Sequence, residues 1–92
     1  MSVLSNDEVK NKLEKLKGWS YSDNSIEKEY ELKDFTHAIG FVTQVGIEAE
    51  KADHHPDILI HSWNKVKIKL STHDQGGVTE KDISLAEKVE TF

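Results

Sequence analysis

Two segments of the chain alternate between charged and mainly apolar positions, and this alternation restricts the fold more than any other feature. In segment 26–32 one face carries three glutamates, and the other carries Ile26, Lys28, Tyr30 and Leu32. In segment 65–70 three lysines alternate with Val66, Ile68 and Leu70. Because successive side chains of a strand point to opposite faces, both segments are predicted to be strands with one charged face. If these strands are neighbours, glutamates and lysines pair across them.

Helix signals and turn signals account for much of the remaining chain. Ser5 and Glu8 form a capping-box pattern and predict a helix over about residues 6–17, which a glycine then ends. Thr79 and Asp82 form a similar pattern before a helix that runs toward the C-terminus. A short strand at 19–22, turn residues at 23–25 and the segment 26–32 predict a hairpin. A short apolar strand at 58–60 and the segment 65–70 predict another.

A long amphipathic helix is predicted between the two hairpins. Asp34 is placed to cap it, and Pro56 disfavours helix at the preceding residue, so the helix is predicted to end just before or at His54-His55. Its predicted apolar stripe consists of Phe35, Ala38, Ile39, Val42, Val45, Ala49 and Ala52, widened by Phe41. Gly40 and Ile47 fall on the opposite side, which predicts that the helix has contacts on both faces.

The order of these elements defines the expected fold class. The chain is predicted to be α+β with the order α-β-β-α-β-β-α, a four-stranded antiparallel sheet and helices packed on one face. With 92 residues and no repeat or linker, residues 1–92 are expected to form a single domain. A domain of this size buries a modest core, so association between copies is a reasonable expectation.

Composition excludes several classes of function. The formal net charge of −5 disfavours direct nucleic-acid binding, and the absence of cysteine excludes disulfides, thiolate metal sites and cysteine nucleophiles. The N-terminal residues lack a basic region followed by an apolar core, and no apolar run approaches the ~18 residues of a membrane span. A cytoplasmic protein without membrane contact is therefore expected.

Candidate chemistry is concentrated in segment 50–56, which contains an acid, two adjacent histidines and the only proline of the chain. A third histidine, His73, follows in a polar loop after the second hairpin. The unperturbed pKa of imidazole lies near neutrality, so a group of histidines suits proton transfer if the fold brings them together.

The pattern of these residues resembles the pterin-4a-carbinolamine dehydratase family. It consists of an acid, three residues, His-His-Pro, an aromatic residue, and then a distant histidine and aspartate: Glu50, His54-His55-Pro56, Trp63, His73 and Asp82. The resemblance is most specific over about residues 50–87, and the preceding elements agree in order. Six residues separate Pro56 from Trp63, at the long end of the family's range.

The resemblance implies a reaction and a set of roles. The family dehydrates 4a-hydroxytetrahydropterin, the form in which aromatic amino acid hydroxylases leave their cofactor, to quinonoid dihydropterin, with no metal and no organic cofactor. By this analogy His54 and His73 are the acid–base pair on opposite sides of the ring, and His55 binds substrate. Asp53, Ser71 and Thr72 are expected to hold the polar edge of the pterin beside the three histidines.

Three further residues are expected to support the site. Glu50 lies one helical turn before His54, so it could orient an imidazole and stabilise its protonated form. Asp82 could do the same or only cap its helix. Trp63 is more often a core or rim aromatic than a platform for the pterin. His37 and His61 are interpreted as surface residues.

Two other functions compete with the dehydratase interpretation. Three histidines can bind zinc, although adjacent His54 and His55 diverge in an extended chain and their spacing matches no usual zinc motif. Alternatively, the chain is a pterin-binding or dimerisation module, because vertebrate members of the family also act as dimerisation cofactors for a homeodomain transcription factor. The resemblance also predicts a homodimer or homotetramer, assembled through the long helix.

Overall fold

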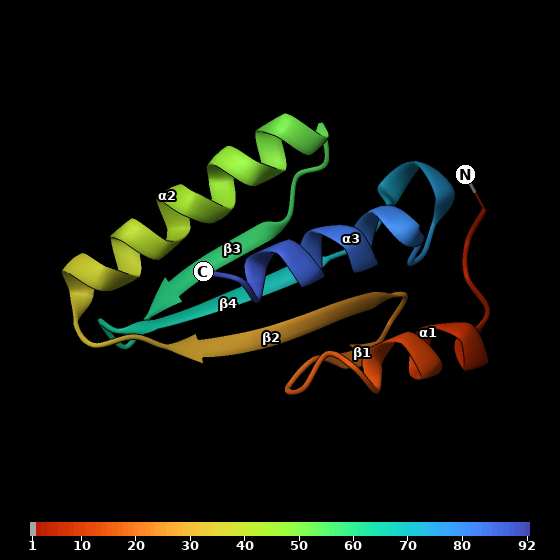
Figure 1. Ribbon diagram of the computed structural model, residues 1–92, viewed down its shortest axis with the longest axis horizontal. Coiled ribbons are helices and arrows are strands. Elements are labelled where there is room, and N and C mark those ends of the chain that lie inside the picture. Colours follow the sequence, from red (N-terminus) through yellow and green to blue (C-terminus); the bar gives the residue numbers. More distant parts are fainter. Residues whose placement is uncertain (1) are drawn as a thin grey trace.

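The computed structural model describes residues 2–92 and contains three α-helices, one short 3-10 helix and one four-stranded sheet (Figure 1). The elements follow the chain in this order: α1 (Asn6–Leu13), β1 (Ser20–Ser22), β2 (Ser25–Glu31), α2 (Phe35–Ala52), β3 (Asp57–His61), β4 (Lys65–Leu70), η1 (His73–Gln75) and α3 (Glu80–Val89). This order confirms the predicted α-β-β-α-β-β-α arrangement and the α+β class. Within residues 2–92 no helix is long and apolar enough to cross a membrane.

The sheet is antiparallel throughout and has the strand order β1-β2-β4-β3. The two alternating strands, β2 and β4, are neighbours at its centre, which is the condition that the sequence set for pairing of glutamates and lysines across them. Their register places Glu27 opposite Lys69, Glu29 opposite Lys67, and Glu31 opposite Lys65. On the other face, the same register places Ile26 opposite Leu70 and Tyr30 opposite Val66. One face of the sheet is therefore charged and the other packs against the core.

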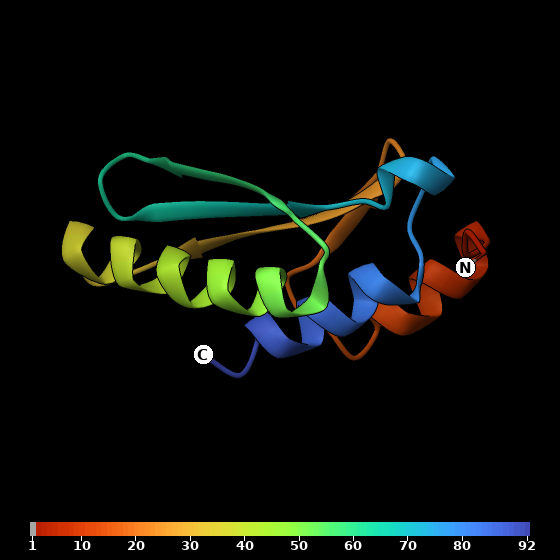
Figure 2. The same ribbon diagram turned by 90° about the horizontal axis from the view of Figure 1, so that it is seen from above.

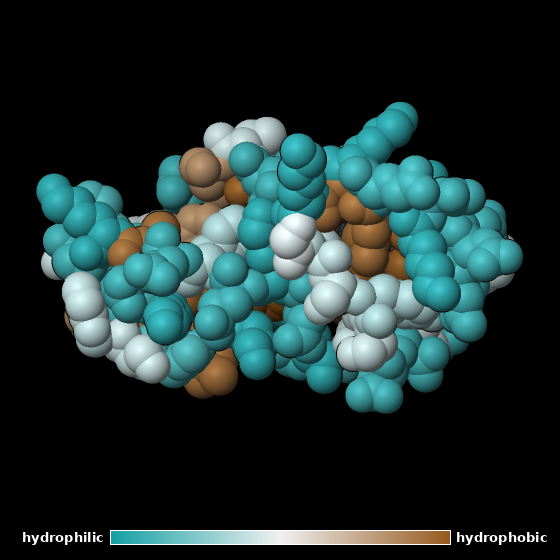
Figure 3. All heavy atoms as spheres, turned by 90° about the horizontal axis from the view of Figure 1, so that it is seen from below, coloured by the Kyte–Doolittle hydropathy of each residue, from teal (hydrophilic) through white to brown (hydrophobic). Residues whose placement is uncertain are grey.

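All three helices lie on the core face of the sheet (Figure 2). Fully buried side chains from the helices and from the two central strands meet there, among them Val9, Val45, Ile26, Ile68 and Val89. The opposite face remains open and carries the glutamates and lysines of β2 and β4. Viewed from the side on which α1 and β1 lie nearest, the surface is largely hydrophilic (Figure 3). The helices therefore cover one face of the sheet and leave the charged face open.

Helix α2 packs through part of the predicted apolar stripe. Its buried residues are Ala38, Phe41, Val45 and Ala49. Phe35 and Ile39 were predicted to be buried but are 53% and 44% exposed, and Ala52 is also exposed. The helix packs against the sheet and against α3. Its buried side is therefore displaced around the helix axis from the middle of the predicted apolar stripe. Ile47, on the outer side, is 52% exposed.

Helix α1 keeps its predicted start but ends earlier than predicted. The capping box of Ser5 and Glu8 is present, and so are the caps at Asp34 and Thr79. The end predicted near residue 17 is wrong, since α1 ends at Leu13 and the next three backbone N–H groups donate to carbonyls three residues earlier. That tighter turn leads to Gly18, whose φ of 87° favours glycine. A Cβ at Gly18 would lie 2.9 Å from Cε of Lys28, because the Lys28 side chain of β2 passes close to the backbone of Gly18.

Candidate active site

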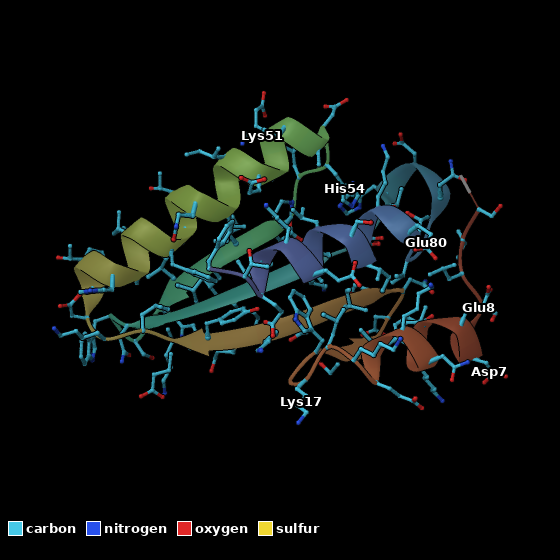
Figure 4. The ribbon with its side chains drawn as sticks, viewed as in Figure 1. Asp7, Glu8, Lys17, Lys51, His54 and Glu80 are labelled. Carbon is cyan, nitrogen blue, oxygen red and sulfur yellow. The ribbon has the colours of Figure 1, made fainter. Side chains whose placement is uncertain are left out.

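The end of α2, the segment after β4 and the start of α3 meet at one end of the sheet. They surround an open hollow of about 180 Å³ that is lined by Asp53, His54, His55, Ser71, Thr72, His73, Asp74 and Lys81. The hollow thus contains all three histidines singled out in the sequence, together with the three predicted substrate-binding residues. Figure 4 shows His54 between the C-terminal end of α2 and the N-terminal end of α3.

The end of α2 separates the two adjacent histidines. Asp53 adopts a left-handed conformation, with φ 51° and ψ 45°, and its N–H donates to the carbonyls of Ala49 and Glu50. The backbone N–H of His54 donates to Ala49, and Pro56 then keeps the chain from continuing as a helix. As a result His54 turns inward and is 8% exposed, whereas His55 remains exposed.

A buried carboxylate holds His54. Nε2 of His54 lies 2.5 Å from Oδ1 of Asp82, whose side chain is fully buried. The second oxygen of Asp82 accepts hydrogen bonds from the Thr72 hydroxyl and the Thr79 N–H, both at 2.9 Å. Since a carboxylate can only accept, Nε2 of His54 carries the hydrogen. Asp82 therefore caps α3 and also orients His54, which combines the two roles considered from the sequence.

The other nitrogen of His54 faces the hollow. Nδ1 has no hydrogen-bond partner within residues 2–92, and no fully buried side-chain nitrogen or oxygen in that range lacks a partner. Nδ1 is consequently not fully buried, and His54 is among the residues that line the hollow. With Nε2–H directed at Asp82, a neutral His54 presents a lone pair at Nδ1 and can accept a proton from a bound molecule.

His73 is positioned by the turn that follows β4. Thr72 N–H donates to the carbonyl of Gly77, and Gly76, in the left-handed region with φ 76°, closes the short helix η1. The Thr72 hydroxyl points to Asp82, so the residue before His73 belongs to the same network as His54. The His73 side chain is exposed and has no side-chain hydrogen bond within residues 2–92. His73 therefore reaches the hollow as a free imidazole.

Glu50 contacts the neighbouring histidine rather than His54. Its Oε1 lies 2.8 Å from Nε2 of His55, and the two side chains are 81% and 61% exposed. The left-handed turn at Asp53 interrupts helical spacing, so the one-turn relation expected between Glu50 and His54 does not form. A pair this exposed contributes little to stability, on the order of 0–1 kcal/mol. It can nevertheless hold the ring of His55 at the rim of the hollow.

Trp63 lies far from the hollow within one chain. It is in the turn between β3 and β4, at the opposite end of β3 from the histidines, and is 60% exposed.

Asp74, Lys81 and Thr79 were not predicted as site residues, although the first two line the hollow and Thr79 belongs to the Asp82 network. These three residues are close to His73 and Asp82 in the sequence, and this closeness is the one feature from which they could have been predicted. Within residues 2–92 no three histidine, aspartate or glutamate side chains are arranged to hold a metal ion.

Comparisons with known proteins identify the family of the chain. The family model described as "Pterin 4 alpha carbinolamine dehydratase" matches residues 2–92. A Roseiflexus castenholzii protein is 47% identical over 98% of this chain and 97% of its own length, and one from Sulfolobus acidocaldarius is 42% identical over 94% and 93%. Both are described as "Putative pterin-4-alpha-carbinolamine dehydratase".

A solved structure is similar over nearly the whole chain. It is described as a "transcriptional coactivator/pterin dehydratase" from Brucella melitensis, with 38% identity, a TM-score of 0.92, and coverage of 98% of this chain and 97% of that chain. The fold therefore agrees with that of a solved relative as well as with the predicted element order. The family model and these relatives show that the chain belongs to the pterin-4a-carbinolamine dehydratase family.

Proposed function

We propose that the chain dehydrates 4a-hydroxytetrahydropterin to quinonoid dihydropterin by histidine acid–base catalysis. The observation that carries this proposal is one hollow that holds Nδ1 of His54 and the imidazole ring of His73, both without a hydrogen-bond partner among residues 2–92, beside a third histidine. Family membership and the names of the relatives support the same reaction class. Reduction of the product would regenerate the tetrahydropterin cofactor of aromatic amino acid hydroxylases.

The reaction requires two proton transfers and no change of redox state. The C4a–O bond breaks, and the departing hydroxyl takes a proton from an acid and leaves as water. The N5–H bond breaks, its electrons form the C4a=N5 double bond, and its proton passes to a base. A positioned imidazole typically contributes ~10²–10⁴-fold to such a step and can act in either role near neutral pH.

We assign the roles by analogy with the family, and the way in which each imidazole is held supports the assignment. His54 is buried and oriented by Asp82, so it presents a fixed Nδ1 from one side of the hollow. His73 enters from the segment after β4, so we assign it to the other face of the pterin. His55, held at the rim by Glu50, is assigned to substrate binding.

Single alanine variants test these roles on the two epimers of the 4a-hydroxyl. His54→Ala should slow one epimer more and His73→Ala the other, because each imidazole serves one face. His55→Ala should raise KM more than it lowers kcat. Melting curves provide the control for folding of each variant. Equal loss for both epimers in every variant would refute the two-face assignment.

We further infer that copies of the chain associate through the outer side of α2. Phe35, Ile39 and Ile47 are apolar and 53%, 44% and 52% exposed on this one helix. Association would remove these side chains from water at about 25 cal/mol per Å² of apolar surface. Ile47→Glu should lower the assembly state in sedimentation at micromolar concentration. A wild-type chain that sediments as a 10.5 kDa monomer would overturn this inference.

A binding role is the second candidate. The Brucella melitensis relative carries "transcriptional coactivator" in its description, and the exposed apolar side of α2 is a surface on which a partner could compete with a second copy. The same variant distinguishes the roles. Ile47→Glu should abolish partner capture from the native cell and leave the dehydration rate per chain unaltered if the two functions are separate.

A further inference from the structure

A groove between α2 and α3 adjoins the three-histidine hollow. The two helices run in opposite directions (Figure 1 and Figure 2), and the groove between them has a volume of about 360 Å³. This volume lies within the roughly 300–1,000 Å³ of typical small-molecule sites. The groove shares Lys81 with the hollow and is lined by none of the histidines. Nothing in the dehydration chemistry described above uses this space.

The floor of the groove is apolar, and lysines lie along one of its sides. Leu85 of α3 is 4% exposed, and Ala52 of α2 adds a methyl group to the lining. Lys81, Leu85 and Lys88 follow one another at helical spacing, so all three lie on the same face of α3. Lysine side chains lay their methylene groups along apolar surface and keep the ammonium group in water. The groove therefore combines an apolar floor with positive charge at its rim.

The charges of the groove that lack a partner are positive. Each of its two glutamates forms an ion pair, Glu48 with Lys51 at 3.4 Å and Glu80 with a lysine of α1 at 3.0 Å. The side chains of Lys81 and Lys88 have no ion pair and no hydrogen bond within residues 2–92. This positive excess is local, since the chain as a whole has a net charge of −5. It favours an anion over a cation in the groove.

The anionic group of a ligand is favoured at Lys88 rather than at Lys81. Lys81 lines the histidine hollow together with the carboxylates of Asp53 and Asp74, which would repel a further anion. Lys88 is seven residues further along α3, which corresponds to about 10.5 Å along the helix axis. Leu85 lies between the two lysines. A chain that starts at Lys88 can therefore cover the apolar floor over about this length.

We propose that the groove between α2 and α3 binds a carboxylate with a linear apolar chain, the chemical class of the medium-chain fatty acids. The carboxylate pairs with Lys88, and the chain lies over Leu85 toward Ala52. Burial of the chain supplies most of the affinity, because an exposed ion pair contributes little by itself. The site does not depend on the dehydration reaction, since no histidine takes part in it.

Calorimetric titration of the whole chain with octanoate tests the proposal, with octylamine and acetate as comparison ligands. Octanoate should bind with a Kd of roughly millimolar order, the affinity expected for about ten non-hydrogen atoms. Octylamine has the same chain with the opposite charge, and acetate has the carboxylate without the chain. Both should bind at least about 5-fold more weakly. In nitrogen–proton NMR spectra, octanoate should shift the amide signals of residues 48–52 and 81–88 most.

Two variants locate the ligand in the groove. Lys88→Glu should weaken octanoate binding about 5–10-fold, because it replaces an attraction with a repulsion. Ser84→Glu adds a carboxylate to the exposed lining and should weaken binding by a similar factor. Lys10→Glu is the matched control, because Lys10 is in the last turn of α1, as Lys88 is in the last turn of α3, and does not line the groove. Melting curves verify that each variant is folded.

Three results would overturn the proposal. One is equal weakening of octanoate binding by Lys88→Glu and by Lys10→Glu, since binding would then reflect net charge alone. Another is octylamine binding that is as tight as octanoate binding. The third is binding of the chain to phosphatidylglycerol vesicles without binding of free octanoate, because the groove would then recognise a lipid surface rather than a single carboxylate.

Discussion

Asp82→Asn is the most informative substitution, because one buried carboxylate holds both the cap of α3 and the orientation of His54. Asp82 accepts from His54 Nε2, the Thr72 hydroxyl and the Thr79 N–H. The amide has nearly the same shape but one oxygen becomes an NH₂ donor. Turning that donor toward the Thr79 N–H would oppose two donors, so it should face His54 instead. His54 must then accept at Nε2 and carry its hydrogen at Nδ1.

The magnitude follows from the three hydrogen bonds that lose their ionised acceptor. Hydrogen bonds to charged groups contribute about 1.5–3 kcal/mol and neutral ones about 0.5–1.5, so each of the three bonds loses about 1–1.5 kcal/mol and a loss of roughly 3–4.5 kcal/mol in all is expected. For a domain of this size that corresponds to a fall in Tm of about 12–36 °C. The dehydration rate should fall by up to about 10²-fold in addition, since Nδ1 of His54 no longer offers a lone pair.

Two measurements check this prediction, namely the tautomer of His54 by nitrogen NMR and the dehydration rate below the variant's Tm. Glu80→Gln is the matched control, because Glu80 lies on the same turn of α3 and loses only an exposed ion pair with Lys12. It should change Tm by a few degrees at most. If Asp82→Asn leaves the His54 tautomer and the rate unaltered while Tm falls, Asp82 is a cap alone and the positioning role is refuted.

Three further predictions concern stability. Burial tends to raise the pKa of the Glu90 carboxyl, but hydrogen bonds from Tyr30 and Lys28 hold it below its ordinary value of 4.5. The ionised Glu90 carboxylate therefore stabilises the fold fully above about pH 5, and this contribution is lost as the pH falls through the lowered pKa. Glu90→Gln should make the decrease in Tm toward acid pH shallower than in the wild-type chain. An equally steep decrease would contradict this prediction. Trp63 has a φ of 57°, which costs a bulky residue about 1 kcal/mol, so Trp63→Asn should raise Tm, and a lower Tm would show that the turn is unstrained. Ser5→Ala removes a helix cap and should cost about 1 kcal/mol in denaturant unfolding, whereas an unchanged midpoint would contradict the cap's contribution.

Features that depend on local rules could be predicted from the sequence. Alternation in segments 26–32 and 65–70 defined two strands and their outward charges, because side chains in a strand have a period of two. Capping residues such as Thr79 marked helix starts, since they satisfy backbone donors a few residues away. The histidines could be grouped because a proline and a turn-forming loop place them near the ends of elements.

Features that depend on tertiary packing were not predictable in the same way. The hydrogen bond between His54 and Asp82 joins residues 28 apart, and nothing local distinguishes Asp82 as a partner from Asp82 as a cap. Glu50 appeared to be spaced for His54, but a left-handed residue between them turned it to His55. The buried line of α2 was predicted from apolarity alone. The observed line keeps Phe41, which was predicted, and leaves Phe35 outside, because the sheet and α3 determine which side is covered.

The most direct test of the proposed reaction is the rate of water loss from freshly formed 4a-hydroxytetrahydropterin, measured with wild-type chain and with a variant that combines His54→Ala and His73→Ala. The proposal predicts a wild-type rate well above the uncatalysed background. It predicts a rate close to that background for the double variant, because no imidazole then faces the C4a and N5 groups. A wild-type rate equal to the background, or a folded double variant with full activity, would contradict it.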